Sequence, residues 1–575
     1  MLSMDKQTTV FSRQIMMRPI VFIKYLLIGL VITLLSGCAT YQQEVHKGLA
    51  LAHHGDWKDA ESQFKSALDK PQDKLLYYLE AGALAQNQGD YKRSNQLLSK
   101  ADILSDTFFQ ENFKNRAWAL LSNPRQGDYR GNGFERVYIS YLKSLNYLAL
   151  AQQATQPIQK RQLQDAALVE ARRIDNKLNE IQAQEPSYAA LDAKENQAFY
   201  LKALDWLSGF YTRGHNDKYL YRDDAWARYL EGIQYEQSKD YDDARISYQQ
   251  AAKLYESGYA KQYGLSNVTA ERAWLDTIRM MRKGGDWSQD DINRLIQQKL
   301  SPAMQKTLKD YQQGDGELII LENEGFVPAK SELSLQLYAD PDAYSLVLAP
   351  FLANGDNQQN DAFRWFTMVY ADVNPLNLIA NYKAGGAWGA FGGVFTKRVI
   401  LGPTVWKQLE RAHLDTLLTQ QFIRITVPYY PRFTLDHHIP QISLNGSDIK
   451  TTSIRMSSLS DIALQEQLSN AQRDIYESLV RELLRSWLAF RIANSVHDNT
   501  AKLILSLVGQ VAVFSSSAAD TRNWLTLPAQ IRLTRIPLKA GDYTPQYKIN
   551  NKDFSHDKIV IKPDNITLWN LRNPY

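Results

Sequence analysis

The chain contains a single cysteine, Cys38, and its thiol is the side chain whose chemistry is easiest to define. One cysteine excludes an intramolecular disulfide and any metal site that needs several thiolates. What remains for a lone thiol is modification, in which the sulfur accepts a covalently attached group. The residues around Cys38 therefore indicate what that group is.

A secretion signal precedes this cysteine. Arg18 and Lys24 lead into the apolar run Tyr25–Leu35, and Ser36 and Gly37 follow at once. A basic start, a short apolar run and small residues before a cut are typical of a signal peptide, and the run is shorter than the ~20 residues of a spanning helix. We expect residues 1–37 to be removed, with cleavage between Gly37 and Cys38.

The segment Leu35-Ser36-Gly37-Cys38 resembles the lipobox of bacterial lipoproteins. The resemblance implies a diacylglyceryl group on the thiol, cleavage before Cys38 and a further acyl chain, such as palmitate, on the new amine. Several acyl chains give stable anchoring in a membrane. Ala39 stands where an aspartate would be the usual inner-membrane retention signal, so the resemblance predicts an outer-membrane lipoprotein that faces the periplasm.

The motifs of common enzymes are absent from the sequence. No Gly-x-Ser-x-Gly, P-loop or His-Glu-x-x-His motif occurs, and no Gly-x-Gly-x-x-Gly follows a strand. His437 and His438 are adjacent, and neighbouring side chains of an extended segment point to opposite faces. Asp240, Asp242 and Asp243 fit a helix start, where carboxylates complement the helix dipole. We expect no metal, no cofactor and no enzyme, although carboxylates from distant segments can still converge.

The charge of the chain argues against nucleic acid as a partner. The formal charge is +4, of which residues 1–37 supply +3, so the remainder is nearly neutral. Proteins that bind nucleic acid normally present a basic face to the phosphates. At 575 residues the chain is also too long for one hydrophobic core, which predicts several domains.

Two segments near the start of the mature chain repeat each other at a constant spacing. The matched positions are Gly48 and Gly82, Gly55 and Gly89, Trp57 and Tyr91, Ala60 and Ser94, Phe64 and Leu98, and Ala67 and Ala101. This spacing is the ~34-residue period of tetratricopeptide repeats, in which a glycine lets two helices approach closely. A third unit keeps the pattern in another phase, with Gly232, Tyr235, Tyr241, Ala244, Tyr248 and Ala251.

These patterns predict an α+β multidomain chain, with an all-α tetratricopeptide-like solenoid followed by a mixed α+β domain. We place the signal at 1–37, the helical repeats at 38–300 and the α+β domain at 301–575. Helical periodicity predicts a further pair at 137–153 and 161–182, and a long helix at 461–494. Short apolar runs predict strands at 317–321, 333–337, 422–427, 510–514, 531–537 and 558–561.

Two longer apolar runs lie in the second half, at 384–395 and 503–514. The first has glycines at every fourth position, Gly385, Gly389 and Gly393, a spacing that lets helices touch. Either run is too short to span a bilayer as a helix. We expect the run at 384–395 to be a buried segment of the protein. The alternative is that it docks on a partner.

Several stretches are similar to a family of uncharacterised bacterial outer-membrane lipoproteins with N-terminal tetratricopeptide repeats. They are 133–136 with Tyr141, Leu145 and Leu148, then 167–173, 316–328, and 520–528 with Ile531, Arg535 and 541–543. Within the fourth stretch, Asp520, Arg522 and Trp524 are open to two interpretations. They form a site, or they form a structural corner with a local ion pair and a buried tryptophan.

The leading functional hypothesis is a scaffold whose repeats bind one or more envelope proteins, in support of cell-wall synthesis, surface-structure assembly or export. The alternative is an enzyme or binding protein for peptidoglycan or another glycan, with Tyr429, Tyr430 and Tyr547 stacking on sugars. A third hypothesis makes the glycine-rich segment part of an oligomeric outer-membrane assembly.

Overall fold

The computed structural model describes most of the chain from Gln43 onward. The described residues are 43–111, 125, 127–183, 223–351, 357–370, 396–411, 414–420, 423–433, 439–449, 451–494, 518–549 and 552–575. Gly37 and Cys38, the two apolar runs with the expected strand at 510–514, and His437 and His438 lie outside them.

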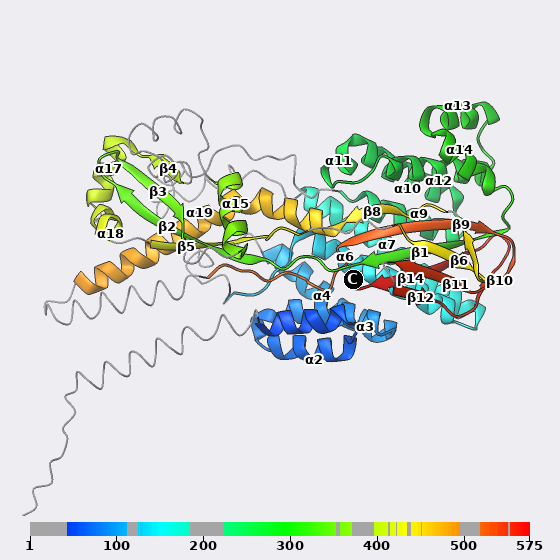
Figure 1. Cartoon of the computed structure of the whole chain (residues 1–575), viewed down its shortest axis with the longest axis horizontal. Helices are drawn as coiled ribbons and strands as arrows, with labels where there is room; N and C mark the ends of the chain where they lie inside the picture. Colours follow the sequence, from blue (N-terminus) through cyan, green and yellow to red (C-terminus); the bar gives the residue numbers. More distant parts are fainter. Residues whose placement is uncertain are drawn as a thin grey trace, which may run out of the picture.

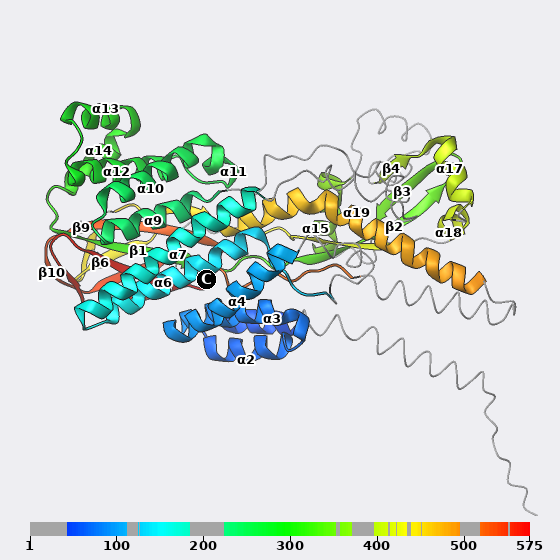
Figure 2. The ribbon, with the colours of Figure 1, turned by 180° about the vertical axis from the view of Figure 1, so that it is seen from behind.

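Helices make up the N-terminal half, and most form antiparallel pairs (Figures 1 and 2). They are 43–53, α2 (Trp57–Ala67), η1 (Pro71–Asp73), α3 (Lys74–Asn87), α4 (Tyr91–Glu111), α6 (Gly133–Gln153), α7 (Pro157–Ala183), α9 (Ala225–Gln237), α10 (Tyr241–Leu254), η4 (Tyr255–Tyr259), α11 (Ala260–Gln262), α12 (Val268–Gly284), α13 (Gln289–Lys299) and α14 (Pro302–Asp310). The helices expected at 137–153 and 161–182 are confirmed by α6 and α7.

The starts of several helices follow from their first residues. A capping box opens α6, in which the Asn132 side chain accepts the Glu135 N–H and the Glu135 side chain accepts the Asn132 N–H. Ser288 caps α13 and Ser301 caps α14, where Pro302 fixes the first helical residue.

A four-stranded sheet lies against these helices, with the strand order β14-β1-β9-β8. Its strands are β1 (Gly316–Glu324), β8 (Ile454–Ser458), β9 (Gln530–Leu538) and β14 (Ile566–Asn573). The strand β1 is parallel to β14 and antiparallel to β9, so the centre of the sheet joins segments that lie far apart in the sequence.

A second four-stranded sheet covers the far face of the first. Its order is β12-β11-β6-β7, and its strands are β6 (Gln441–Leu444), β7 (Ser447–Ile449), β11 (Pro545–Ile549) and β12 (Lys552–Ser555). A small pair of strands, β10 (Gly541–Tyr543) and β13 (Ile559–Ile561), forms a separate two-stranded sheet, in which β13 lies beside β1 and β14. Successive residues of β1 alternate between the two layers: Ile319 belongs to the core on the helical side, and Ile320 to the core between the sheets.

A separate lobe forms around a third sheet, of order β4-β3-β2-β5 (Figure 1). Its elements are β2 (Ser331–Asp340), β3 (Ser345–Pro350), α15 (Asn357–Val369), β4 (Lys397–Ile400), α17 (Gly402–Arg411), α18 (Leu414–Gln420) and β5 (Ile423–Tyr429). The lobe has its own apolar core. In the chain it is an insertion between β1 and β6.

One long helix, α19 (Leu459–Asn494), connects the lobe to the rest of the molecule (Figures 1 and 2). Leu459 and Ile462 belong to the core beside the N-terminal helices, whereas Ile475 and Leu479 belong to the core of the lobe. The helix expected at 461–494 is therefore confirmed. Among the described residues no helix has both the length and the apolar character needed to cross a bilayer.

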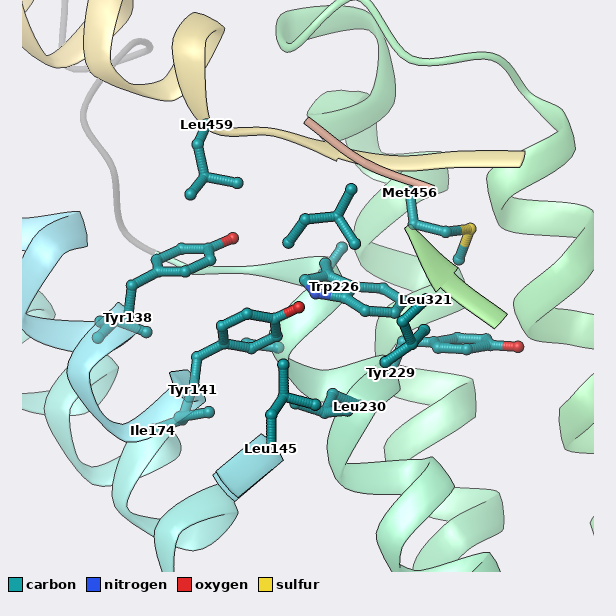
Figure 3. Close-up of a cluster of buried hydrophobic side chains, with 14 of the residues drawn as sticks. Tyr138, Tyr141, Leu145, Ile174, Trp226, Tyr229, Leu230, Leu321, Met456 and Leu459 are labelled. Atoms are coloured by element: carbon teal, nitrogen blue, oxygen red, sulfur yellow. The ribbon is translucent and has the colours of Figure 1, made fainter. Parts of the chain in front are cut away.

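The coarse fold class, helices first and sheets in the C-terminal part, is confirmed. Strands β1, β2, β5, β9 and β13 lie where the sequence predicts strands. The change from helix to strand falls after α14, close to the predicted boundary at 300. The hydrophobic core does not end there, because one cluster joins Tyr141 and Trp226 of the helices with Leu321 and Met456 of the sheet (Figure 3).

Candidate functional site

The repeat glycines lie where two helices touch. A Cβ on Gly48 would come within 3.1 Å of the Phe64 ring, and one on Gly82 within 2.7 Å of the Leu98 side chain. A Cβ on Gly232 would lie 2.6 Å from the Tyr248 ring. In all three cases the residue that the glycine contacts follows it by the same number of positions in the sequence. The missing side chain lets the second helix of each pair approach the first.

The small and apolar positions of the pattern are buried in the same contacts between paired helices, which we call seams. Ala60, Phe64, Leu98, Ala244 and Tyr248 have no exposed surface. The aromatic residues that open the second helices, Trp57, Tyr91 and Tyr241, are half-buried.

The turns between the paired helices share an unusual backbone conformation. Gly55 has a φ of 81° and Gly89 one of 78°, and Lys239, at the equivalent position of the third unit, has a φ of 64°. A left-handed conformation favours glycine, so the residue type of Lys239 does not predict it. An aspartate follows in each turn, and Asp240, Asp242 and Asp243 lie at the start of α10 as expected.

A buried set of charged residues joins the helices to the sheet. Arg535 of β9 donates to Glu317 of β1 (2.5 Å) and to Glu236 of α9 (2.8 Å). It also lies 3.3 Å from Asp276 of α12. All four side chains are almost fully buried. The guanidinium therefore binds three acids from three separate elements.

Two arginines of α12 complete this set. Arg272 binds Asp276 at 2.7 Å, and Arg279 binds Asp276 at 2.6 Å and Glu236 at 2.7 Å. Three arginines and three acids balance, and the arginines hold the pKa of Glu317 down to about 2 against the effect of its burial. A balanced, buried cluster of this kind suits a structural junction better than a binding site.

The segment at 518–529, which we call the strap, crosses from the sheet to the first helices. Its Arg522 binds Asp520 at 2.6 Å and Asp73 at 2.9 Å, and Trp524 is completely buried. The structural corner expected from Asp520, Arg522 and Trp524 is thus present. No local pattern indicates that Asp73, 449 residues away, also holds the arginine.

Two buried glutamates of the helical half accept hydrogen bonds from backbone N–H groups of the strap. Glu80 of α3 accepts N–H groups of Leu525 (2.7 Å) and Thr526 (3.1 Å), and Glu135 of α6 accepts that of Trp524 (2.8 Å). Burial raises the pKa of Glu80 to about 8, although the donated hydrogen bonds oppose this. The strap thereby ties the two halves together.

The tyrosines suggested for glycan stacking are not on the surface. Tyr429 and Tyr547 are fully buried, and Tyr430 is only 4% exposed. Tyr429 packs in the core of the lobe, and the Tyr547 hydroxyl donates to buried Glu322 at 2.7 Å. The expectation of a tyrosine-rich surface is wrong, because the alternation of β5 and β11 turns Tyr429 and Tyr547 inward.

His53 also makes more contacts than its position at the end of a helix predicts. Its ring is 2.8 Å from the Pro574 carbonyl oxygen and meets the Phe326 ring edge-on at 4.6 Å. This contact brings the C-terminal strand beside the first helix.

Two acids lie on the facing helices where α7 packs on α9. The charge of Asp175 on α7 acts on the Glu231 carboxyl of α9, and Arg228 lies 3.2 Å from Asp175. The Ser247 hydroxyl donates to Glu231 at 3.2 Å. Burial, and secondarily the charge of Asp175, raise the pKa of Glu231 to about 7.

A shallow hollow lies on the second sheet, beside the β6–β7 hairpin. It is lined by Pro440, Gln441, Ile442, Asp448, Ile449, Thr451 and Thr452 and is open to solvent. Within the described part of the chain, no group of three or more His, Cys, Asp and Glu side chains is arranged to hold a metal ion. Neither protein-family models nor curated proteins gave a match to this chain.

Proposed function

We propose that the chain is a lipid-anchored scaffold of the bacterial envelope. Cys38 attaches it to the outer membrane, the folded part faces the periplasm, and tetratricopeptide-like repeats bind one or more other envelope proteins. The proposal assigns the molecule a binding role and no catalytic step. It agrees with the resemblance of the chain to uncharacterised outer-membrane lipoproteins.

The observation that carries the proposal is the repeated helix pair. Three pairs use the same device, a glycine in the first helix against a large side chain at the matching position of the second, and two have glycine in the turn. Stacked pairs of this kind commonly serve as protein-binding surfaces. The alternative of a glycan-binding protein loses its main support, since the three tyrosines are buried.

Exposed apolar side chains on the helical half are candidates for contact with a partner. Ile103 of α4 is 68% exposed and Val169 of α7 is 53% exposed. Their neighbours in sequence, Asp102 and Glu170, both bind the Lys143 ammonium, at 3.6 and 2.7 Å. Ile103 and Val169 therefore lie on two helices that both pack on α6, and we propose them as contacts of one interface.

The binding role is tested by crosslinking the full-length lipoprotein in its own envelope. We expect the double variant Ile103→Glu, Val169→Glu to lose a protein that the wild type captures. Both residues are exposed, so the fold should be retained. The control is Ile439→Glu, at a 91% exposed position outside the repeats. Capture of the same protein by the double variant and the wild type would place the interface elsewhere.

The anchor is tested separately by two substitutions. Cys38→Ser should abolish labelling with radioactive palmitate and release the protein from membranes, because it removes the only thiol. Ala39→Asp should keep the label but move the protein to the inner membrane. A Cys38→Ser protein that still sediments with the outer membrane and still carries palmitate would contradict the anchor.

A further inference from the structure

The first helix pair begins very close to the residue that carries the proposed lipid anchor. Only residues 39–42, which we call the tether, separate Cys38 from Gln43, where the helix 43–53 begins. An extended chain spans at most ~3.6 Å per residue, so Gln43 lies no more than about 18 Å from Cys38. Acyl chains on Cys38 lie in the hydrocarbon layer and hold the cysteine near the headgroups. The start of this helix is therefore kept close to the membrane surface.

The helix 43–53 and α2 run in opposite directions, so the start of the first lies beside the end of the second. Gly48 contacts Phe64 in their seam, and the turn that joins the two helices is at the far end. A short connection follows α2, so the first turn of α3 lies at the same end. Residues 43–47 and 65–74 thus form one end of the first helix pair, which we call the anchor end.

Four exposed lysines lie at the anchor end: Lys47, Lys65, Lys70 and Lys74. Within the described part of the chain, none of these lysines forms an ion pair. The acids of the same end are Glu44, Asp69 and Asp73, and Asp73 is bound by Arg125 and Arg522. Four lysines therefore face two acids without an arginine, which leaves a charge of 4 − 2 = +2.

The segments outside the described residues that adjoin this end in the sequence add no net negative charge. The tether is uncharged, and residues 112–124 contain Lys114 and Arg116 but no acid. Residues 495–517, which precede the strap, contain one acid and one base. The positive charge of the anchor end therefore does not depend on where these segments lie.

The other end of the first helix pair has the opposite charge. Around the turn between the helix 43–53 and α2, Asp56 and Asp59 flank Lys58, and all three are exposed. Each lysine near an anionic lipid surface favours contact by about fivefold. Of the two ends, only the anchor end has the charge that attracts anionic headgroups.

We propose that the anchor end rests on anionic phospholipid headgroups of the membrane that holds Cys38. The tether brings this end to the surface, and its lysines bind the headgroups, as a basic patch supports the binding of other lipidated proteins. The inference rests on the proposed lipid anchor, and it adds which part of the folded body contacts the membrane.

A fluorescent reporter on the full-length lipoprotein tests this contact. Because acylation uses the thiol of Cys38, Ser66→Cys supplies a single labelling site at an exposed position of the anchor end. The matched site is Gln298→Cys on α13, which lies across the body from α2 in both views (Figures 1 and 2). The vesicles contain phosphatidylcholine, phosphatidylglycerol and a lipid whose headgroup carries a nitroxide quencher. We expect strong quenching at Ser66 and little at Gln298.

The lysines are tested by the double variant Lys65→Gln, Lys70→Gln, with Lys58→Gln as the control from the other end of the pair. Two lysines favour contact by about 25-fold, so the double variant should lower the ratio of docked to undocked protein at Ser66 by about that factor. Lys58→Gln should behave like the wild type. Vesicles without phosphatidylglycerol, or salt of about 1 M, which screens charges beyond about 3 Å, should reproduce the loss.

Labelling of the same samples with radioactive palmitate separates this inference from the anchor itself. Equal quenching at Ser66 and Gln298 in a palmitate-labelled protein would overturn the membrane contact and leave the anchor in place. Quenching at Ser66 that the double variant keeps in full would also overturn it, since the lysines would then not bind the headgroups. A protein without palmitate would remove the tether, and with it both the anchor and this inference.

Discussion

At the scale of single residues, the seam glycines show that a repeated sequence pattern can predict which residues contact each other in the fold. The repeat period identified Gly48 and Gly82 as helix contacts, and they lie against Phe64 and Leu98. The left-handed backbone conformation of Lys239, with a φ of 64°, could not be predicted from the sequence, because lysine has no preference for positive φ. Patterned residue types predict contacts, whereas backbone strain at one residue leaves no pattern.

Gly232 is the seam glycine with the least room for a side chain. The Tyr248 ring beside it cannot move aside easily, since its hydroxyl donates to Glu236 at 2.9 Å and accepts from Arg535 at 3.1 Å. We therefore expect Gly232→Ala to lower the free energy of unfolding by about 1 to 3 kcal/mol through overpacking.

Denaturant unfolding of the full chain, followed by tryptophan fluorescence, measures this effect. Gly284→Ala is the matched control, because Gly284 is also helical but no atom lies within 4 Å of its added Cβ. The control should unfold at or slightly above the wild-type midpoint. Equal midpoints for the two variants would mean that the α9–α10 seam is looser than the structure indicates.

At the scale of elements, local periodicity predicted the long helices and five of the strands, but not their partners. The strand β1 was expected from its apolar run, yet it lies between β9 and β14, which come from the end of the chain. The charges of Glu317 and Arg535 carry no local signal either, since they meet across 218 residues. Pairing between strands and ion pairs between layers depend on the whole chain, so sequence windows do not contain them.

The cluster around Arg535 makes a specific prediction about the junction of helices and sheet. Arg535→Met keeps much of the side-chain volume but removes the cation that binds Glu317, Glu236 and Asp276. We expect a loss of about 3 to 5 kcal/mol, the typical cost of leaving buried charges without a partner.

Thermal unfolding and limited proteolysis of the full chain test this loss. The comparison variant is Arg294→Met on α13, where the arginine is 63% exposed and its ion pair with Asp291 contributes little. A shift for Arg535→Met no larger than that for Arg294→Met would show that the buried cluster is not needed to join the two layers.

At the scale of the whole molecule, the N-terminal helices and the first sheet form one body. They share an apolar core, and the strap and the Arg535 cluster cross between them. A fragment that ends near residue 300 would expose this core and remove the strap and sheet groups that bind Glu236 and Glu80. Binding and stability are therefore better tested by point variants of the full chain than by deletions.

The lobe around β2–β5 stands apart, and α19 is the element that sets its position. Leu459 to Ala463 pack in the main body, Leu468 to Leu483 pack against the core of the lobe, and Leu464 contacts both cores. Asn470 belongs to neither core. Asn470→Pro removes one helical hydrogen bond and makes the proline ring clash with the preceding turn, at a cost of about 3 kcal/mol. Both cores should survive, since neither includes Asn470, while the angle between lobe and body should change.

Small-angle X-ray scattering of the full chain measures this change as an altered maximum dimension. Asn470→Ala, which favours the helix, should leave the scattering curve as in the wild type. Near-ultraviolet circular dichroism reports whether both cores remain packed, so that a misfolded variant is recognised. An Asn470→Pro curve identical to that of Asn470→Ala would mean that contacts other than α19 fix the lobe. With a changed curve and intact cores, the helix itself is the element that holds the lobe in place.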